Sequence, residues 1–282
     1  MTRWEACGRA IVADGVPKVM GIVNVTPDSF SDGGLAGTLA GAVAHAMHLI
    51  AEGADLLDLG GESSRPGAEP VPLDEELRRV IPVVEALTPL VTVPISVDTI
   101  KAEVARQALR AGASIVNDIR GLDGDPELSR LVAEAGAGVV LMHMAGTPQT
   151  MQVDPCYDDV VQEVRDDLAR RIERAEASGI PRERIAIDPG IGFGKTLEHN
   201  LELLRNLDRF ANLGCALLVG TSRKGFLGTL TGRPVGDRAT ASVVSSLVAV
   251  ARGADVVRVH DVGPMVDAIK VWTALVGPKG MP

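Results

Sequence analysis

Short apolar segments recur along the chain, and each of them ends on or just before a polar residue. Near-continuous apolar runs of this length are typical of parallel strands that are covered on both faces. Eight of them alternate with helical stretches, which predicts an α/β chain of the (β/α)8 TIM-barrel class, with its active site at the C-terminal ends of the strands. The polar residues at those ends are Asn24, Glu62, Asp98, Asn117, His143, Asp188, Ser222 and His260.

Helical patterns fill the intervals between these strands, over residues 38–52, 74–88, 100–111, 126–135, 157–178, 197–212, 238–252 and 264–275. A weak repeat also recurs, in which a charged helix end is followed by Gly-Ala, an apolar run, polar residues and Gly. A repeated helix–strand unit supports the barrel independently of the strand count. No linker divides the chain, so we expect one domain over 1–282, with residues 1–15 forming a hairpin that closes the barrel bottom.

Two long stretches are too polar and too rich in glycine and proline for strands or helices. They are residues 25–37 and 61–72, which follow the first and second strands. We call them the first and second rim loops, because loops after barrel strands lie at the active-site face. We expect them to act as mobile lids.

Composition and charge limit the classes of partner. A length of 282 residues suits one barrel of about 250 residues, and the 46% hydrophobic content with only 2% aromatics suits its aliphatic core. A net charge of −9 argues against nucleic acid or an anionic membrane as the main partner. The three cysteines are too few and too widely spaced for a disulfide framework or a zinc site.

The chain shows no apolar stretch of signal-peptide type and no run of membrane-spanning length. We therefore expect a reduced, cytoplasmic enzyme. Against the acidic background, cationic residues fall at or beside the predicted strand ends, which favours a small anionic ligand. These residues are Arg65, Lys224, Arg258 and His260.

The segment DPGIGFGKT (188–196) looks at first like a phosphate-binding P-loop. That motif requires glycine at the position that Pro189 occupies, so the P-loop interpretation fails. We expect the glycines to let the backbone approach a flat ligand, and a tight turn alone is the alternative.

Asp98, Asn117 and Asp188 form the sharpest group of candidate site residues. Carboxylates accept parallel N–H bonds and an amide both donates and accepts, so together they could bind the edge of a guanine-like or pterin-like heterocycle. The alternative is that each is a helix cap or a buried structural acid. Asp58 and Asp118 are expected to be structural, because neighbouring residues on a strand point to opposite faces.

Two further motifs carry cations. GTSRKG (220–225) places Lys224 near the usual phosphate site of barrels, either as a Schiff-base lysine or, as we favour, as a hydrogen-bonding and charge-stabilising group. Arg258 and His260 lie two residues apart on one face of the last strand, where such a pair can clamp an anion. A surface ion pair is the alternative.

His143, within an apolar strand, is expected to support the core rather than to catalyse. The chain lacks metal-ligand spacing of the His-Glu-x-x-His type. Any metal is therefore expected to be a hard cation that the phosphates of a ligand hold.

The motifs, taken in their order, identify the chain as resembling the dihydropteroate synthase family of pterin-binding barrel enzymes. The resemblance runs from about residue 18 to 276 through GIVNVTPDSFSDGG, GGESSRPG, ISVDT, VNDIRG, LMHMAGTPQTM, DPGIGFGK, SRK and RVHDV. It implies condensation of 6-hydroxymethyl-7,8-dihydropterin diphosphate with 4-aminobenzoate to 7,8-dihydropteroate and pyrophosphate, with Mg²⁺, by an SN1-like course. It also implies a homodimer and competition by sulfonamides at the aminobenzoate pocket.

The resemblance further implies roles for individual residues. The catalytic groups would be Asp98, Asp188, Lys224 and Arg258, and the pterin pocket Asp98, Asn117, Asp188 and Lys224. Pyrophosphate would contact Asn24, which also matches the Mg²⁺-linked residue, with Ser64, Arg65, Arg258 and His260. Aminobenzoate would lie among Phe30, Asp32, Pro66, Phe193, Ser222 and Lys224.

The chain departs from the family at Ser64, where the second rim loop of the family carries threonine. The hydroxyl survives and a methyl group is lost, which bears on loop order and sulfonamide sensitivity. The alternatives are a methyltetrahydrofolate–corrinoid methyltransferase, which would not need the SRK loop, and a non-catalytic pterin-binding paralogue, which should have lost residues such as Arg65. A Schiff-base aldolase is more distant.

Overall fold

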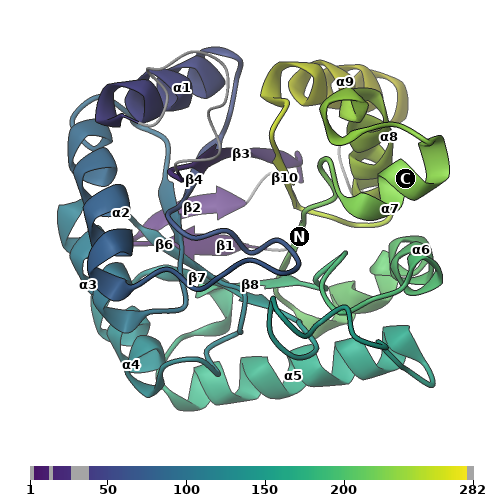
Figure 1. Cartoon of the computed structure of the whole chain (residues 1–282), viewed down its shortest axis with the longest axis horizontal. Helices are drawn as coiled ribbons and strands as arrows, with labels where there is room; N and C mark the ends of the chain where they lie inside the picture. Colours follow the sequence, from purple (N-terminus) through teal and green to yellow (C-terminus); the bar gives the residue numbers. More distant parts are fainter. Residues whose placement is uncertain (1–2, 13–14, 27–37, 278–282) are drawn as a thin grey trace.

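The computed structural model describes residues 3–12, 15–26 and 38–277, and its centre is a closed barrel of parallel strands (Figure 1). The strands follow one another around the barrel in sequence order, and the last pairs with the first. They are β3 (Lys18–Asn24), β4 (Leu56–Gly60), β5 (Ile95–Asp98), β6 (Ile115–Asp118), β7 (Gly138–Met142), β8 (Ile185–Asp188), β9 (Ala216–Val219) and β10 (Val256–Val259). The predicted TIM barrel is confirmed.

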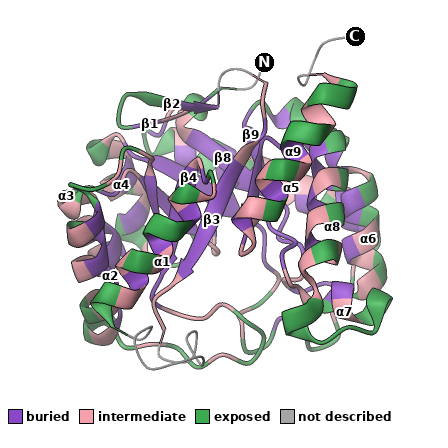
Figure 2. Ribbon diagram, turned by 90° about the horizontal axis from the view of Figure 1, so that it is seen from above, coloured by how far each residue is buried: buried purple, intermediate pink, exposed green. Residues whose placement is uncertain are grey.

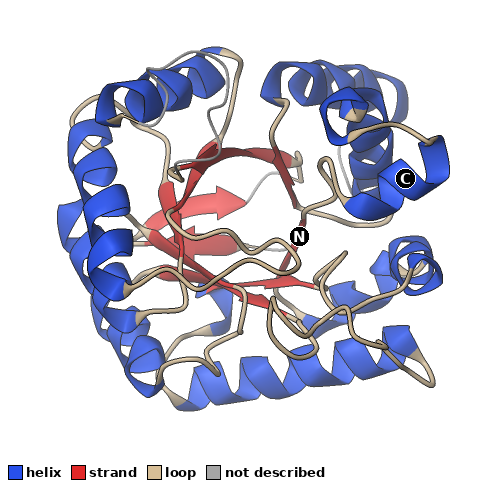
Figure 3. Ribbon diagram, viewed as in Figure 1, coloured by secondary structure: helices blue, strands red, loops and turns tan. Residues whose placement is uncertain are grey.

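Helices form the outer ring around the strands (Figure 3). They are α1 (Leu39–Ala51), α2 (Leu73–Leu87), α3 (Ala102–Ala111), α4 (Pro126–Ala135), α5 (Val160–Ala177), α6 (Leu197–Arg205), α7 (Gly225–Thr231), α8 (Ala239–Ala251) and α9 (Val262–Val276). Two details differ from the expectation. The helix predicted over 197–212 divides into α6 and a 3-10 helix at Leu207–Leu213, and the sequence pattern missed α7, which has only seven residues.

The glycines of the sequence repeat end helices, as their position suggests. Gly112 and Gly136 are the C-caps of α3 and α4, with left-handed φ values of 116° and 66°. A residue with a side chain adopts these angles only with strain, so glycine lets the chain leave the helix and enter the next strand at once.

An antiparallel hairpin, β1 (Trp4–Ala6) and β2 (Arg9–Val12), lies at one end of the barrel. Trp4 is fully buried, and its indole N–H donates to the carbonyl of Arg184 at 3.1 Å. The apolar residues of the hairpin form one cluster with Met20, Leu56, Ile115 and the other inward residues of the strands' first halves. Figure 2 shows β3 pointing away from the hairpin, so the hairpin covers the N-terminal end.

Strand side chains alternate between this interior cluster and the helices outside. Val97, Val116 and Ile187 point outward into the main core between strands and helices. The residues that follow them, Asp98, Asn117 and Asp188, therefore point inward at the C-terminal end.

In the part of the chain that the structure describes, none of the helices has the length and apolar character needed to span a membrane.

Candidate active site

Arg258 holds together a buried polar network at the C-terminal end of the barrel. Its Nε donates to Asp58 Oδ2 at 2.6 Å, and its Nη2 donates to Asp98 Oδ2 at 2.9 Å. Asn117 Nδ2 donates to the same Asp58 oxygen at 3.0 Å. Residues of β4, β5, β6 and β10 thus converge on one point, and three of them are predicted site residues.

Asp58 is the unexpected member of this network. The sequence pattern set it apart as a structural acid, yet its inaccessible carboxylate holds two predicted site residues, Asn117 and Arg258. The signal that could have found it is its position on β4, two residues before Gly60 and therefore on the same inward face. Asp118 points outward instead, where it accepts N–H bonds from Arg120 and Leu122 at 2.8 and 2.7 Å and so shapes the loop after β6.

Burial raises the pKa of two carboxylates at the barrel mouth, those of Asp98 and Asp188. It raises the pKa of Asp98 to about 7, although Arg258 opposes the shift and Asp58 adds to it. Burial also raises the pKa of Asp188, against the nearby Lys224 ammonium and a 2.7 Å bond from the Gly190 N–H. Because both acids lie in low-dielectric surroundings, their protonation responds strongly to a bound ligand.

Lys224 lies in the loop after β9, the strand that pairs with β10, which carries Arg258. Its Nζ donates to the carbonyl of Ile191 and lies 4.4 Å from the centroid of the Phe193 ring, a cation–π distance. Burial lowers the pKa of Lys224 to about 8, and Asp188 opposes that shift. The amine can therefore donate hydrogen bonds at neutral pH while remaining close to its deprotonation point. The loops after β8 and β9 bring these groups together.

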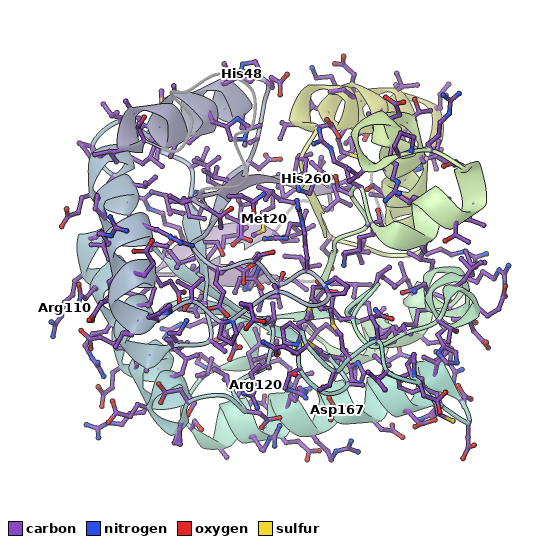
Figure 4. All side chains as sticks on the ribbon, viewed as in Figure 1. Met20, His48, Arg110, Arg120, Asp167 and His260 are labelled. Carbon is purple, nitrogen blue, oxygen red and sulfur yellow. The ribbon has the colours of Figure 1, made fainter. Side chains whose placement is uncertain are left out.

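His260 differs from the expected cationic clamp. Its Nδ1 lies 3.0 Å from Ser222 Oγ, and its backbone N–H donates to the same oxygen at 3.1 Å. Burial, together with the cations Arg223 and Arg258, lowers the pKa of His260 to about 3. His260 is therefore neutral at physiological pH, so Arg258 supplies the positive charge and the histidine supplies a neutral hydrogen-bonding group. In Figure 4, His260 projects over the barrel interior, whereas His48 and Arg110 lie on the outer helices.

The loop after β9, which carries the SRK motif, is held in place by an ion pair that the sequence did not reveal. Arg223 adopts a left-handed φ of 57° and binds Asp261 through Nε at 3.1 Å and Nη2 at 2.5 Å. Its backbone N–H donates to Ser242 Oγ at 2.9 Å. The ion pair joins the loop after β9 to the residue that follows His260. It therefore holds Ser222 and Lys224, the two neighbours of Arg223 in the chain, in place.

Lys195, two residues after Phe193, carries a second buried amine. The sequence suggested no role for it beyond the rejected P-loop. Its Nζ lies 3.0 Å from His143 Nδ1 and donates to the Phe193 carbonyl at 2.9 Å. Burial lowers the pKa of Lys195 to about 7 and that of His143 to about 3. His143 therefore acts as a neutral acceptor that ties the loop after β7 to the loop after β8, in line with the supporting role expected of it.

The glycines of the 188–196 segment make close contacts within the chain. Gly190, at φ 68°, lies so close to the His143 carbonyl oxygen that a Cβ would overlap it. A Cβ on Gly194 would lie 2.9 Å from the side chain and carbonyl of Ala145, and one on Gly192 would lie 3.0 Å from Cδ of Lys224. These contacts favour the alternative of a tight turn, and a role of the glycines in ligand approach stays a prediction.

The second rim loop lies over the polar network, bonded at its base and its tip. Glu62 at its base binds Lys101, while at the tip the Gly67 N–H donates to the Pro148 carbonyl and Gln149 donates to the Ala68 carbonyl, each at 3.0 Å. A cavity of about 160 Å³ lies beneath it, lined by residues that include Ser64 and Asp98.

The remaining predicted residues are placed unequally. Arg65 and Pro66 are exposed on the second rim loop, and the Arg65 charge is among those that depress the His260 pKa. Asn24, half-buried at the end of β3, pairs in register with Gly60. Phe30 and Asp32 of the first rim loop lie outside the described residues.

Known proteins are similar to this chain over most of its length. The family model described as "Pterin binding enzyme" matches residues 20–260. The chain is similar to the dihydropteroate synthase of Escherichia coli strain K12, with 49% identity over 263 residues that cover 93% of each chain. It is also similar to that of Neisseria meningitidis serogroup C, with 48% identity over 96% of this chain and 97% of the relative.

Solved structures give the same result. The dihydropteroate synthase of Xanthomonas albilineans with 4-aminobenzoic acid superposes with a TM-score of 0.91 at 49% identity, covering 100% of both chains. The Yersinia pestis enzyme in a sulfonamide drug complex superposes with a TM-score of 0.92 at 44% identity, covering 97% of this chain and 98% of that one.

Proposed function

Because the chain belongs to the pterin-binding enzyme family, we propose that it is the dihydropteroate synthase of a folate pathway. It condenses 6-hydroxymethyl-7,8-dihydropterin diphosphate with 4-aminobenzoate to 7,8-dihydropteroate and pyrophosphate. The observation that carries the proposal is the convergence of Asp58, Asp98, Asn117 and Arg258 at the barrel mouth, in a chain that matches synthases along almost its whole length.

The pterin ring binds among Asp98, Asn117, Asp188 and Lys224. The ring presents N–H donors along one edge and carbonyl and ring-nitrogen acceptors elsewhere. Carboxylates of Asp98 and Asp188 accept from the donors, while Asn117 and Lys224 supply donors to the acceptors. Asn117 is oriented for this by its bond to Asp58, which consumes one of its amide hydrogens.

The diphosphate binds where Arg258 meets the second rim loop. Asp58 and Asp98 use two N–H donors of the guanidinium and fix its orientation, and its remaining donors are available to an anion. Neutral His260, the Ser64 hydroxyl and the exposed Arg65 add further donors from the rim. Together they stabilise the negative charge that grows on the leaving pyrophosphate.

The donor set also fits Mg²⁺, but only with help from the substrate. Mg²⁺ prefers oxygen ligands and commonly binds through one or two protein groups together with phosphates and water. Asn24 offers one amide oxygen at the rim, and in the part of the chain that the structure describes no three His, Cys, Asp or Glu side chains cluster to cage a metal. Asn24 would hold the ion, which would neutralise charge on the leaving group.

The reaction follows an SN1-like course. Cleavage of the carbon–oxygen bond leaves a cationic methylene that conjugates with the electron-rich pterin, and ionised Asp98 and Asp188 favour that charge. The nitrogen of aminobenzoate then attacks the methylene and loses a proton. A rate that does not respond to electron-withdrawing substitution on the pterin would contradict this course.

The aminobenzoate ring lies against Phe193, Ser222 and Lys224, with Pro66 on the second rim loop. Phe30 and Asp32, which lie outside the described residues, stay predicted contacts. The Lys224 amine supplies a charge for the aminobenzoate, and the neighbouring Phe193 ring supplies a flat apolar surface. Sulfonamides, which resemble aminobenzoate in shape, compete at this pocket, as the Yersinia pestis complex supports. The loss of the threonine methyl at Ser64 bears on the order of the second rim loop and on sulfonamide sensitivity.

The protein also forms a homodimer through α8 and α9. These neighbouring helices expose apolar side chains one turn apart: Val244 and Val248 on α8 are 56% and 44% exposed, and Val271 and Leu275 on α9 are 59% and 81% exposed. An apolar face of this kind on a soluble domain favours association. The cytoplasmic location and the single domain over 1–282 stay predictions.

Measuring pyrophosphate release from the pterin diphosphate, with and without aminobenzoate, tests the activity. The expected result is release that depends on aminobenzoate and is accompanied by dihydropteroate. Lys224→Met should reduce this release strongly, whereas Arg110→Met, at an exposed position of α3 (Figure 4), should leave it unchanged. Folded protein that releases no pyrophosphate in either arm would refute the synthase assignment.

A further inference from the structure

Lys101 occupies a central position at the base of the second rim loop, yet none of the steps above uses it. It follows β5 and directly precedes α3. Its Nζ donates to Glu62 Oε2 at 2.5 Å and also to Glu76 Oε2. Glu62 opens the second rim loop, and Glu76 belongs to α2, so one ammonium group joins three separate segments.

Glu62 itself connects the two ends of the loop. The oxygen that binds Lys101 also accepts the backbone N–H of Val71, at 3.3 Å, near the end of the loop. Beside it, Arg79 Nη1 donates to the Gly61 carbonyl at 2.9 Å. Gly61 lies so close to α2 that a Cβ would be only 2.6 Å from Val80 Cγ2. The base of the loop is therefore held against α2.

The bridge is charged and its inner half is inaccessible to water. Glu76 is 1% exposed, and a buried carboxylate is stable only when a cation or several donors compensate its charge. Lys101 supplies that charge. Although burial opposes it, the hydrogen bonds from Lys101 to Glu62 and Glu76 raise the Lys101 pKa overall. The ammonium therefore remains protonated across the physiological range.

The geometry of this bridge bears on the residues that follow it. Ser64 and Arg65 come two and three positions after Glu62, and Ser64 lines the cavity above Asp98. We propose that Lys101 is a positioning residue that fixes the second rim loop, and with it Ser64 and Arg65, over the diphosphate of the pterin substrate. This inference rests on the proposed synthase function, and it assigns Lys101 no contact with the substrate.

The chain offers a matched control. Arg106, one turn and a half further along α3, is also a cation that bridges two carboxylates, Glu103 and Glu127, but neither of them belongs to a rim loop. Lys101→Met and Arg106→Met therefore both remove a cation from a pair of acids. Only the first releases the base of the second rim loop.

The test measures kcat and KM for the pterin diphosphate, and the affinities for pyrophosphate and for 6-hydroxymethylpterin, which lacks the diphosphate. Lys101→Met should raise KM and weaken pyrophosphate binding by about 10- to 100-fold, as expected for displaced binding groups. The affinity for 6-hydroxymethylpterin should stay within about twofold, because the pterin pocket is untouched. Amide hydrogen exchange should accelerate over 61–72, and Lys101→Arg should restore much of the loss.

Equal weakening of both ligands, no change in a folded Lys101→Met protein, or the same losses in Arg106→Met would overturn the inference. If Lys101→Met does not fold, Glu62→Gln removes the loop's charge while keeping the Lys101–Glu76 pair, and the same selective loss is expected. Failure of the synthase proposal would appear separately, as absent pyrophosphate release by the unaltered protein. Pyrophosphate binding and hydrogen exchange would still report on Lys101 in that case.

Discussion

Replacing Arg258 by methionine tests the network at the barrel mouth most directly. The substitution keeps most of the side-chain volume but leaves Asp58 and Asp98 without their shared cation. Asp58 is fully buried and Asp98 is only 11% exposed, so water replaces the lost bonds poorly. Removing one partner of a buried ion pair commonly costs about 3–5 kcal/mol, a large part of the ~5–15 kcal/mol that stabilises a typical protein.

The free energy of unfolding that Arg258→Met loses should depend on pH, and the titration of Asp98 decides whether it is larger at high or at low pH. Burial already raises its pKa to about 7, and Arg258 opposes that shift, so Arg258→Met should raise the pKa further. An acid whose pKa is higher in the folded than in the unfolded state favours folding at low pH. That contribution is lost as the pH rises through the folded pKa. The destabilisation of Arg258→Met should therefore be larger at about pH 8 than at about pH 5.

Urea unfolding of the two proteins at both pH values measures these differences. The double variant Arg258→Met/Asp58→Asn removes one orphaned charge together with the cation, so it should recover part of the stability lost by Arg258→Met alone. If the single variant loses the same free energy at both pH values, or if Asp58→Asn recovers nothing, the buried-charge reasoning is refuted.

Three further outcomes follow from the site and the surface. The profile of kcat/KM against pH should be bell-shaped, because protonation of Asp98 below pH about 7 and deprotonation of Lys224 above pH about 8 each remove a needed charge. If the alkaline limb of the profile does not move to higher pH in Lys224→Arg, Lys224 is not the group that sets it. Gly190→Ala should lose more than about 2 kcal/mol in thermal or urea unfolding, because its Cβ overlaps the His143 carbonyl, whereas Gly225→Ala, with open space around its Cβ, should change little. Val248→Asp should convert the dimer to monomers in sedimentation experiments, while Val153→Asp, on an isolated exposed valine, should not; a dimer that survives Val248→Asp would exclude the α8–α9 face.

The barrel and most of its inward residues could be predicted because they depend on local, periodic signals. Strand period two places Asp98, Asn117, Asp188 and Arg258 on one face, and parallel strands bring their C-terminal ends together. The short helix α7 gave too few residues for a periodic signal to appear. The bonds of Asp58 to Asn117 and Arg258 could not be predicted for a different reason: they depend on partners far away in the chain, and no local pattern names them.

The sequence by itself determined the order of strands and helices, the rim at which polar groups gather, and the resemblance to pterin-binding enzymes. Only the tertiary structure decided which of those groups pair. Arg258 lies 200 residues from Asp58 and 160 from Asp98 along the chain. They meet because β10 closes the barrel against β3. The neutral state of His260, the Lys195–His143 bond and the Lys101 bridge follow from burial and contact in the same way, since the charge of a side chain depends on what surrounds it.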